Sequence, residues 1–122
     1  MGKRVLLIED EPNIIEAIGF ILARDGWSVA THSDGRDALE VIRRESPDVL
    51  ILDVMLPGRS GFDILAELRA DSGLAATPVL MLTAKGQVKE REAAEAAGAD
   101  RFMAKPFSNA EMLASVRELA GP

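Results

Sequence analysis

Five polar residues stand at the ends of apolar runs in the sequence, and their types suit phosphate chemistry. These residues are Glu9, Asp10, Asp53, Thr83 and Lys105. Crowded carboxylates repel one another, and a hard divalent cation such as Mg²⁺ relieves the repulsion. A lysine ammonium and a threonine hydroxyl beside the metal can bind phosphate oxygens. If these side chains meet, they predict a Mg²⁺-dependent phosphoryl-transfer site with one carboxylate as the nucleophile.

The elements that must position these side chains follow from the apolar pattern. Continuous apolar runs are typical of strands buried on both faces, and apolar residues three or four positions apart indicate amphipathic helices. The pattern predicts strands over residues 5–8, 27–31, 49–52, 79–82 and 102–104. It predicts helices over residues 14–24, 38–45, 62–68, 88–97 and 112–119. Ser108 and Glu111 have the spacing of a capping box, which marks the start of the last helix.

Strands and helices alternate along the chain, and this order favours an α/β fold with a doubly wound parallel sheet covered by helices on both faces. In open sheets of this kind, ligands bind beyond the carboxyl ends of the strands. The five polar residues all lie at predicted strand ends. We therefore expect them to gather at one edge of the sheet.

The length and composition predict a single domain over residues 1–122. Hydrophobic residues make up 48% of the chain, which excludes intrinsic disorder. Twenty acidic and fourteen basic residues give a net charge of −6, which argues against direct nucleic-acid binding. The chain has no cysteine, which excludes a disulfide framework and a thiolate nucleophile. It has one histidine, which disfavours a histidine-rich metal site.

The amino-terminal region predicts no targeting or membrane segment. Its apolar run ends at Ile8 and is followed by three acidic residues. A signal peptide needs an apolar stretch of about 7–15 residues, and a membrane helix needs about 20. We expect a soluble, cytoplasmic protein without a membrane partner.

Five motifs together resemble the receiver domain of response regulators in bacterial two-component signalling. They lie in order along essentially the whole chain: Glu9-Asp10-Glu11-Pro12, Asp53-Val54-Met55-Leu56-Pro57-Gly58 followed by Ser60-Gly61-Phe62, Leu82-Thr83-Ala84, Gly98-Ala99-Asp100 and Lys105-Pro106-Phe107. The resemblance implies five strands in the flavodoxin-like order 2-1-3-4-5, with five helices. It implies a phosphorylation-dependent signalling switch that is not an enzyme, although it assists its own phosphoryl transfer and autodephosphorylation.

The resemblance also assigns the phosphoryl and metal chemistry to residues. Asp53 would accept a phosphoryl group from a histidine kinase or a phosphotransfer protein. Glu9, Asp10, Asp53 and the backbone carbonyl of Met55 would hold Mg²⁺ or Mn²⁺. Many relatives have aspartate where this chain has Glu9, which keeps the charge on an arm one methylene longer.

Signal output is likewise implied by position. Thr83 and Lys105 would bind the phosphoryl oxygens, and Thr83 would move together with Phe102 as a switch. The surface of the fourth helix, fifth strand and fifth helix would then change partners, toward a downstream target that the sequence does not specify. Phe102 replaces the tyrosine of many relatives, so this switch lacks a phenolic hydroxyl.

Taken singly, these residues have ordinary explanations. Glu11 is expected to be a solvated acid near a helix start, Thr83 alone could cap a helix, and Phe102 could be a core aromatic. A cofactor-carrying flavodoxin or a dinucleotide enzyme is the rival class, but acids follow the first strand and no G-x-G-x-x-G motif is present. A Mg²⁺-dependent hydrolase would need a separate acid or base and a substrate-binding insertion.

Two expectations concern details of the site. The Lys105-Pro106 bond is predicted to be cis, because a tight turn must direct Lys105 over the strand ends. Met55 and Lys85 occupy positions that tune phosphoryl lifetime in the family. Met55 offers no strong hydrogen bond to an attacking water, and Lys85 can hold the phosphoryl oxygens, so we expect a long-lived acyl phosphate.

A further expectation concerns self-association. Arg91 and Glu111 match one opposite-charge pair that relatives use for dimers. Arg101 stands where those relatives have an acid, and Ser115 stands where they have a basic partner. The positive Arg101 and the uncharged Ser115 therefore weaken the charge complementarity that sets the register of such an interface. We expect a monomer, with at most weak dimers on activation.

Overall fold

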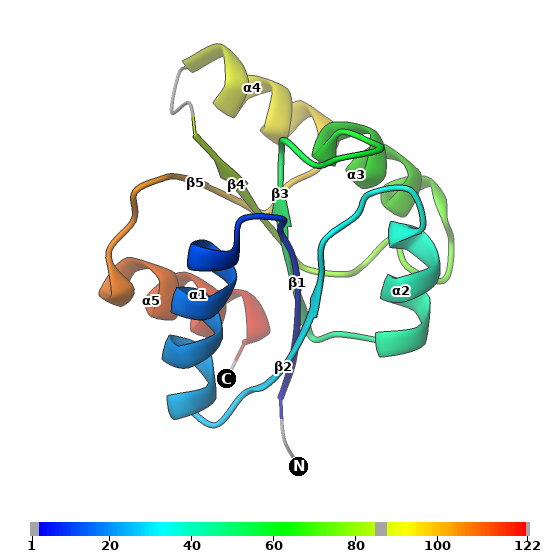
Figure 1. The fold of residues 1–122 in the computed structure, drawn as a ribbon. Helices are drawn as coiled ribbons and strands as arrows, with labels where there is room; N and C mark the ends of the chain where they lie inside the picture. Colours follow the sequence, from blue (N-terminus) through cyan, green and yellow to red (C-terminus); the bar gives the residue numbers. More distant parts are fainter. Residues whose placement is uncertain (1–2, 85–87, 122) are drawn as a thin grey trace.

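The computed structural model describes residues 3–84 and 88–121, and in them strands and helices alternate in strict order (Figure 1). The strands are β1 (Arg4–Ile8), β2 (Ser28–His32), β3 (Val49–Asp53), β4 (Val79–Thr83) and β5 (Arg101–Ala104). The helices are α1 (Pro12–Arg24), α2 (Ala38–Glu45), α3 (Gly61–Ala70), α4 (Val88–Ala97) and α5 (Asn109–Ala120). The predicted α/β class is confirmed.

The strands form one sheet in the order β2-β1-β3-β4-β5, which confirms the order implied by the resemblance. Every neighbouring pair is parallel. The carboxyl ends of all the strands therefore lie at one edge of the sheet. The register pairs Ile8 with Leu52 and Asp53 with Leu82, so the residues that follow these strands lie at similar heights.

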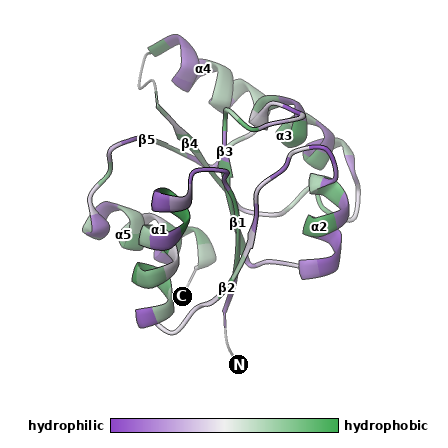
Figure 2. Ribbon diagram, viewed as in Figure 1, coloured by the Kyte–Doolittle hydropathy of each residue, from purple (hydrophilic) through white to green (hydrophobic). Residues whose placement is uncertain are grey.

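Helices cover both faces of the sheet. Figure 1 shows α1 and α5 on one face and α2, α3 and α4 on the other. Successive strand residues point to opposite faces, so each strand supplies both cores. Leu50 and Leu52 pack under α2, α3 and α4, whereas Val49 and Ile51 pack under α1 and α5. Both faces are apolar, which explains the continuous hydrophobic colour of the central strands in Figure 2.

Local sequence signals set the ends of several elements. At the start of α5, Ser108 Oγ accepts a hydrogen bond from the Glu111 N–H at 3.0 Å, and Glu111 Oε1 accepts one from the Ser108 N–H at 3.4 Å. This capping box was predicted, and α5 begins directly after Ser108. Trp27, predicted to open the second strand, lies outside it. The backbone N–H of Trp27 donates a hydrogen bond to the carbonyl of Leu22, just beyond the end of α1.

The helices of the described residues are short, and each carries both hydrophilic and hydrophobic residues (Figure 2). Among them, no helix is long and apolar enough to cross a membrane.

Candidate functional site

The strand ends bring the predicted site residues together. Glu9 follows β1, and its N–H donates to the carbonyl of His32 in β2 at 2.9 Å. Asp53 and Thr83 are the last residues of β3 and β4. Lys105 follows β5, and its N–H donates to the Thr83 carbonyl at 2.7 Å. Backbone hydrogen bonds therefore extend the sheet by one residue at both places and fix where these side chains begin.

Three acids form a compact cluster. Glu9, Asp10 and Asp53 each offer one carboxylate oxygen, and these oxygens lie within 4.8 Å of one another. Glu9 and Asp53 are buried, with 0% and 2% of their surface exposed, whereas Asp10 is exposed at the mouth of the site. Glu9 Oε2 accepts hydrogen bonds from the N–H groups of Asp10 and Glu11, at 3.0 and 3.1 Å. These bonds hold the Glu9 carboxylate in place.

The other oxygen of Glu9 is the strongest sign of a ligand. Glu9 Oε1 lies 3.0 Å from Lys105 Nζ, an ion-pair contact, but no described residue donates a well-directed hydrogen bond to it. A buried polar oxygen ordinarily has hydrogen-bond partners, because an unpaired one costs free energy. Carboxylate oxygens are the ligands that Mg²⁺ and Mn²⁺ prefer. The residues present therefore fit a hard divalent cation.

Lys105 lies among three carboxylates. Its Nζ is 2.9 Å from Glu11 Oε1, 3.0 Å from Glu9 Oε1 and 3.3 Å from Asp53 Oδ1. Its side chain is only 11% exposed. The Lys105-Pro106 peptide bond is cis, as predicted.

The surrounding charges and burial shift the pKa values of Asp53 and Lys105. Burial, and secondly the negative charge of Glu9, raise the pKa of Asp53 to about 7, although Lys105 acts in the opposite direction. Burial by itself would lower the pKa of Lys105. The hydrogen bond to Glu11, the close ion pair with Glu9 and the charge of Asp53 outweigh this effect, so the pKa of Lys105 is raised above its usual value. The lysine is therefore a permanent cation at neutral pH.

Thr83 and Phe102 lie on neighbouring strands. Thr83 is buried, and its hydroxyl donates a hydrogen bond to the Glu90 carboxylate of α4. Phe102 is half-buried in β5 and packs against the core under α2, α3 and α4. The guanidinium of Arg91, also in α4, lies over its ring at 5.5 Å from the centroid. Both predicted switch residues therefore contact α4.

The contact between Glu11 and Lys105 is one that the sequence did not predict. Glu11 was expected to be a solvated acid, and its side chain is indeed 57% exposed. However, it makes the shortest of the contacts to Lys105, from 94 positions away in the chain. Its place directly after Glu9 and Asp10 was the only available signal, and sequence position alone does not tell where such a side chain turns.

The two predicted lifetime positions are less informative. Met55 follows β3 by two residues, and 73% of its surface is exposed. Lys85 lies outside the described residues.

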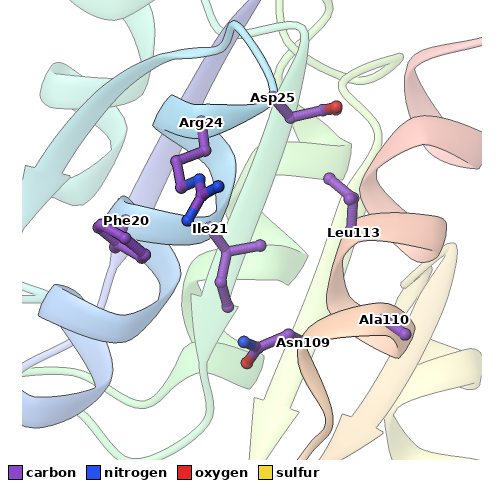
Figure 3. Close-up of a pocket in the computed structure, with 7 residues that line it drawn as sticks. All are labelled: Phe20, Ile21, Arg24, Asp25, Asn109, Ala110 and Leu113. Carbon is purple, nitrogen blue, oxygen red and sulfur yellow. The ribbon is translucent and has the colours of Figure 1, made fainter.

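A separate cavity of about 290 Å³ lies between α1 and α5, and Figure 3 shows its seven lining residues. None of them belongs to the acid cluster.

Comparison with known proteins places the chain in a family. Residues 5–117 match the family described as the response regulator receiver domain. The chain is 42% identical over 119 residues to the transcriptional regulatory protein TcrA of Mycobacterium tuberculosis. It is 39% identical over 117 residues to the DNA-binding response regulator MtrA of Mycolicibacterium smegmatis. These alignments cover 98% and 96% of this chain but 46% and 50% of the relatives, so the chain spans about half their length.

Solved structures agree with this result. The receiver domain of the sensor histidine kinase PA1611 from Pseudomonas aeruginosa, described with a magnesium ion coordinated in its active site cleft, is 30% identical with a TM-score of 0.90, and all of both chains is covered. The BeF3-activated N-terminal receiver domain of RstA from Klebsiella pneumoniae is 28% identical with a TM-score of 0.91, over 98% of this chain and 100% of that one. Sequence and fold therefore lead to one conclusion: the chain belongs to the response regulator receiver domain family.

Proposed function

We propose that this domain is a signalling switch that accepts a phosphoryl group on Asp53. The observation that carries the proposal is the position of Asp53: it is buried at the end of β3, beside two further acids and 3.3 Å from the Lys105 ammonium. Carboxylates act as nucleophiles in aspartyl-phosphate chemistry, and an ammonium can bind the oxygens of the transferred group. The family match supports the same assignment.

The acid cluster would hold the metal. Glu9, Asp10 and Asp53 supply the carboxylates, and the backbone carbonyl of Met55 is proposed as a further ligand. A bound Mg²⁺ or Mn²⁺ would neutralise charge on the phosphoryl oxygens. The well-positioned, buried Glu9 carboxylate supports this assignment, and so does the magnesium ion described for the related receiver of PA1611.

The transfer itself exchanges one bond to phosphorus for another. A carboxylate oxygen of Asp53 forms a bond to phosphorus as the P–N bond of a phosphohistidine breaks, and the imidazole leaves with the bonding pair. Lys105 and the Thr83 hydroxyl are proposed to bind the phosphoryl oxygens on Asp53. In autodephosphorylation, a water oxygen would form a bond to phosphorus as the bond between the Asp53 oxygen and phosphorus breaks. The carboxylate would be restored, inorganic phosphate would leave and the water proton would pass to solvent, with no separate substrate turned over.

Output would follow from a change of hydrogen-bond partner at Thr83. Its hydroxyl donates to Glu90 of α4 in this structure. A phosphoryl group adds about −2 of charge and new acceptor oxygens, which compete for that hydroxyl. When Thr83 turns to the phosphoryl group, α4 loses a contact and Phe102 gains room to turn inward. The α4–β5–α5 surface would then present a different face to its target.

The partners are proposed to be a histidine kinase or a phosphotransfer protein upstream and a target of unspecified identity downstream. We propose that this domain does not itself bind nucleic acid, which its net charge of −6 supports. We also propose that the unphosphorylated domain is a cytoplasmic monomer. Arg101 pairs with Glu118 within this chain, which leaves its charge less available to a second copy.

Phosphorylation by acetyl phosphate with Mg²⁺, followed by intact-protein mass spectrometry, tests the assignment. The wild-type domain should gain one phosphoryl group, and Asp53→Asn should gain none. Asp63→Asn is the matched control, because Asp63 is an exposed aspartate at the start of α3 and should leave labelling unchanged. Labelling of Asp53→Asn at the wild-type level would show that another residue is the acceptor.

A further inference from the structure

Glu11 is a charged residue at the mouth of the site to which the phosphotransfer chemistry gives no role. It is the residue that precedes α1, and its side chain makes no capping hydrogen bond to that helix. A capping side chain at this position, typically that of Ser, Thr, Asp or Asn, accepts a hydrogen bond from the first turn. Glu11 Oε1 instead accepts one from Lys105 Nζ at 2.9 Å. The side chain is therefore directed away from its own helix and toward the phosphate-binding lysine.

The backbone of Glu11 is held while its side chain can move. Its N–H donates to Glu9 Oε2 at 3.1 Å, and its carbonyl accepts hydrogen bonds from Ile14 and Ile15 at 3.1 and 3.0 Å. Only side-chain torsions can therefore separate Glu11 from Lys105. Because the Glu11 side chain is 57% exposed, its carboxylate can move into water without losing its solvation.

The other two partners of Lys105 are different. The side chains of Glu9 and Asp53 are 0% and 3% exposed, and both belong to the cluster that fits a metal ion. Glu11 is outside that cluster. Among the carboxylates that the described residues place on Lys105, Glu11 is thus the one that neither the metal nor the phosphoryl chemistry requires. It is also the one that can leave most easily.

We propose that Glu11 is a positioning residue that competes with the phosphoryl group for Lys105. This inference rests on the proposed function of Asp53. In the unphosphorylated domain, Glu11 holds the ammonium at the mouth of the site. On phosphorylation, Lys105 exchanges the Glu11 carboxylate for a phosphoryl oxygen on Asp53. Glu11 also places a negative charge beside an anionic phosphodonor, and both effects weaken the binding of that donor.

The first experiment measures how phosphorylation depends on donor concentration. Glu11→Gln keeps the size of the side chain and removes its charge. With acetyl phosphate as donor and saturating Mg²⁺, we expect Glu11→Gln to lower the half-saturating donor concentration by about threefold to tenfold, with a smaller change in the maximal rate. Glu16→Gln is the control, because Glu16 is exposed on α1 and the substitution changes the net charge equally. It should change the half-saturating concentration by less than about twofold.

The second experiment observes the contact without phosphorylation. Nuclear magnetic resonance of the lysine ammonium groups, in metal-free protein without phosphodonor, should show faster exchange of the Lys105 ammonium protons with water in Glu11→Gln. The wild-type domain and Glu16→Gln should behave alike. This measurement does not depend on whether Asp53 is the phosphoacceptor, so failure of the proposed function and failure of this inference are distinguishable.

Two results would overturn the inference. One is a half-saturating acetyl phosphate concentration in Glu11→Gln that equals that of Glu16→Gln or exceeds that of the wild type. The other is an unchanged Lys105 ammonium signal in Glu11→Gln. Labelling of Asp53→Asn together with a changed Lys105 signal would instead remove the proposed function and leave the contact in place.

Discussion

Asp53 lies in surroundings that disfavour its charged form, and Asp53→Asn in metal-free protein tests this directly. Asparagine has nearly the shape of aspartic acid and carries no charge at any pH. The comparison therefore isolates the cost of ionising this carboxyl group in the folded domain. EDTA keeps divalent cations, which would stabilise the ionised form, out of the measurement.

The pH dependence of the stability follows from the pKa values of Asp53 in the folded and unfolded states. The folded domain raises the pKa of Asp53 from 3.8 to about 7, mainly through burial and the charge of Glu9. Between these values the folded state holds a proton that the unfolded state has lost. The stability of the wild type must therefore fall as the pH rises through this window. Asp53→Asn lacks this contribution, so it should become the more stable protein as the pH rises.

The size of the effect follows from the shift. At about 1.4 kcal/mol for each pKa unit, a rise from 3.8 to about 7 corresponds to a ceiling of about 4 kcal/mol. The exposed Asp10 shows that water reaches the mouth of the site, and water reduces the cost of the charge. We expect Asp53→Asn to exceed the wild type by about 1–3 kcal/mol in free energy of unfolding at pH 8. Below pH 4 the two proteins should be nearly equal.

Urea denaturation of both proteins at several pH values between 4 and 8 provides the measurement. Asp63→Asn serves as the control, because its aspartate is exposed and the substitution should add no stabilisation of this size. A stability difference between Asp53→Asn and the wild type that does not change with pH would refute the raised pKa. A lower stability of Asp53→Asn at pH 8 would mean that the ion pair with Lys105 outweighs the cost of burial.

Three further variants test other parts of the molecule. Arg69→Met should lower the free energy of unfolding by about 2–4 kcal/mol in urea denaturation, because the guanidinium donates hydrogen bonds to three backbone carbonyls and to Asp100; an unchanged midpoint would contradict this. Gly61→Ala should destabilise the domain by about 2–4 kcal/mol and slow acetyl phosphate labelling, because a Cβ at this position would lie 2.3 Å from the Asp53 carbonyl oxygen. Met55→Asn, combined with Lys85→Glu, should speed phosphate release after the donor is removed, and unchanged release would show that these positions do not set the lifetime.

Much of the fold was predictable from the sequence, for a physical reason. Strands buried on both faces are apolar along most of their length, so β1, β3 and β4 are visible as continuous runs such as Val49 to Leu52. The boundaries were less accurate where polar residues extend an element. The structure starts α1 at Pro12, before the first apolar residue of its periodic face, whereas the predicted capping box marked the start of α5 at Asn109.

The sequence by itself also determined which side chains follow the strands, because parallel strands place their carboxyl ends at one edge. Only the tertiary structure decided how these side chains meet. The contact between Glu11 and Lys105 and the hydrogen bond from Thr83 to Glu90 join separate elements, and their formation depends on helix placement and side-chain torsions. The raised pKa of Asp53 likewise depends on burial and on the nearby charge of Glu9. These are properties of three-dimensional surroundings, which residue type and spacing do not encode locally.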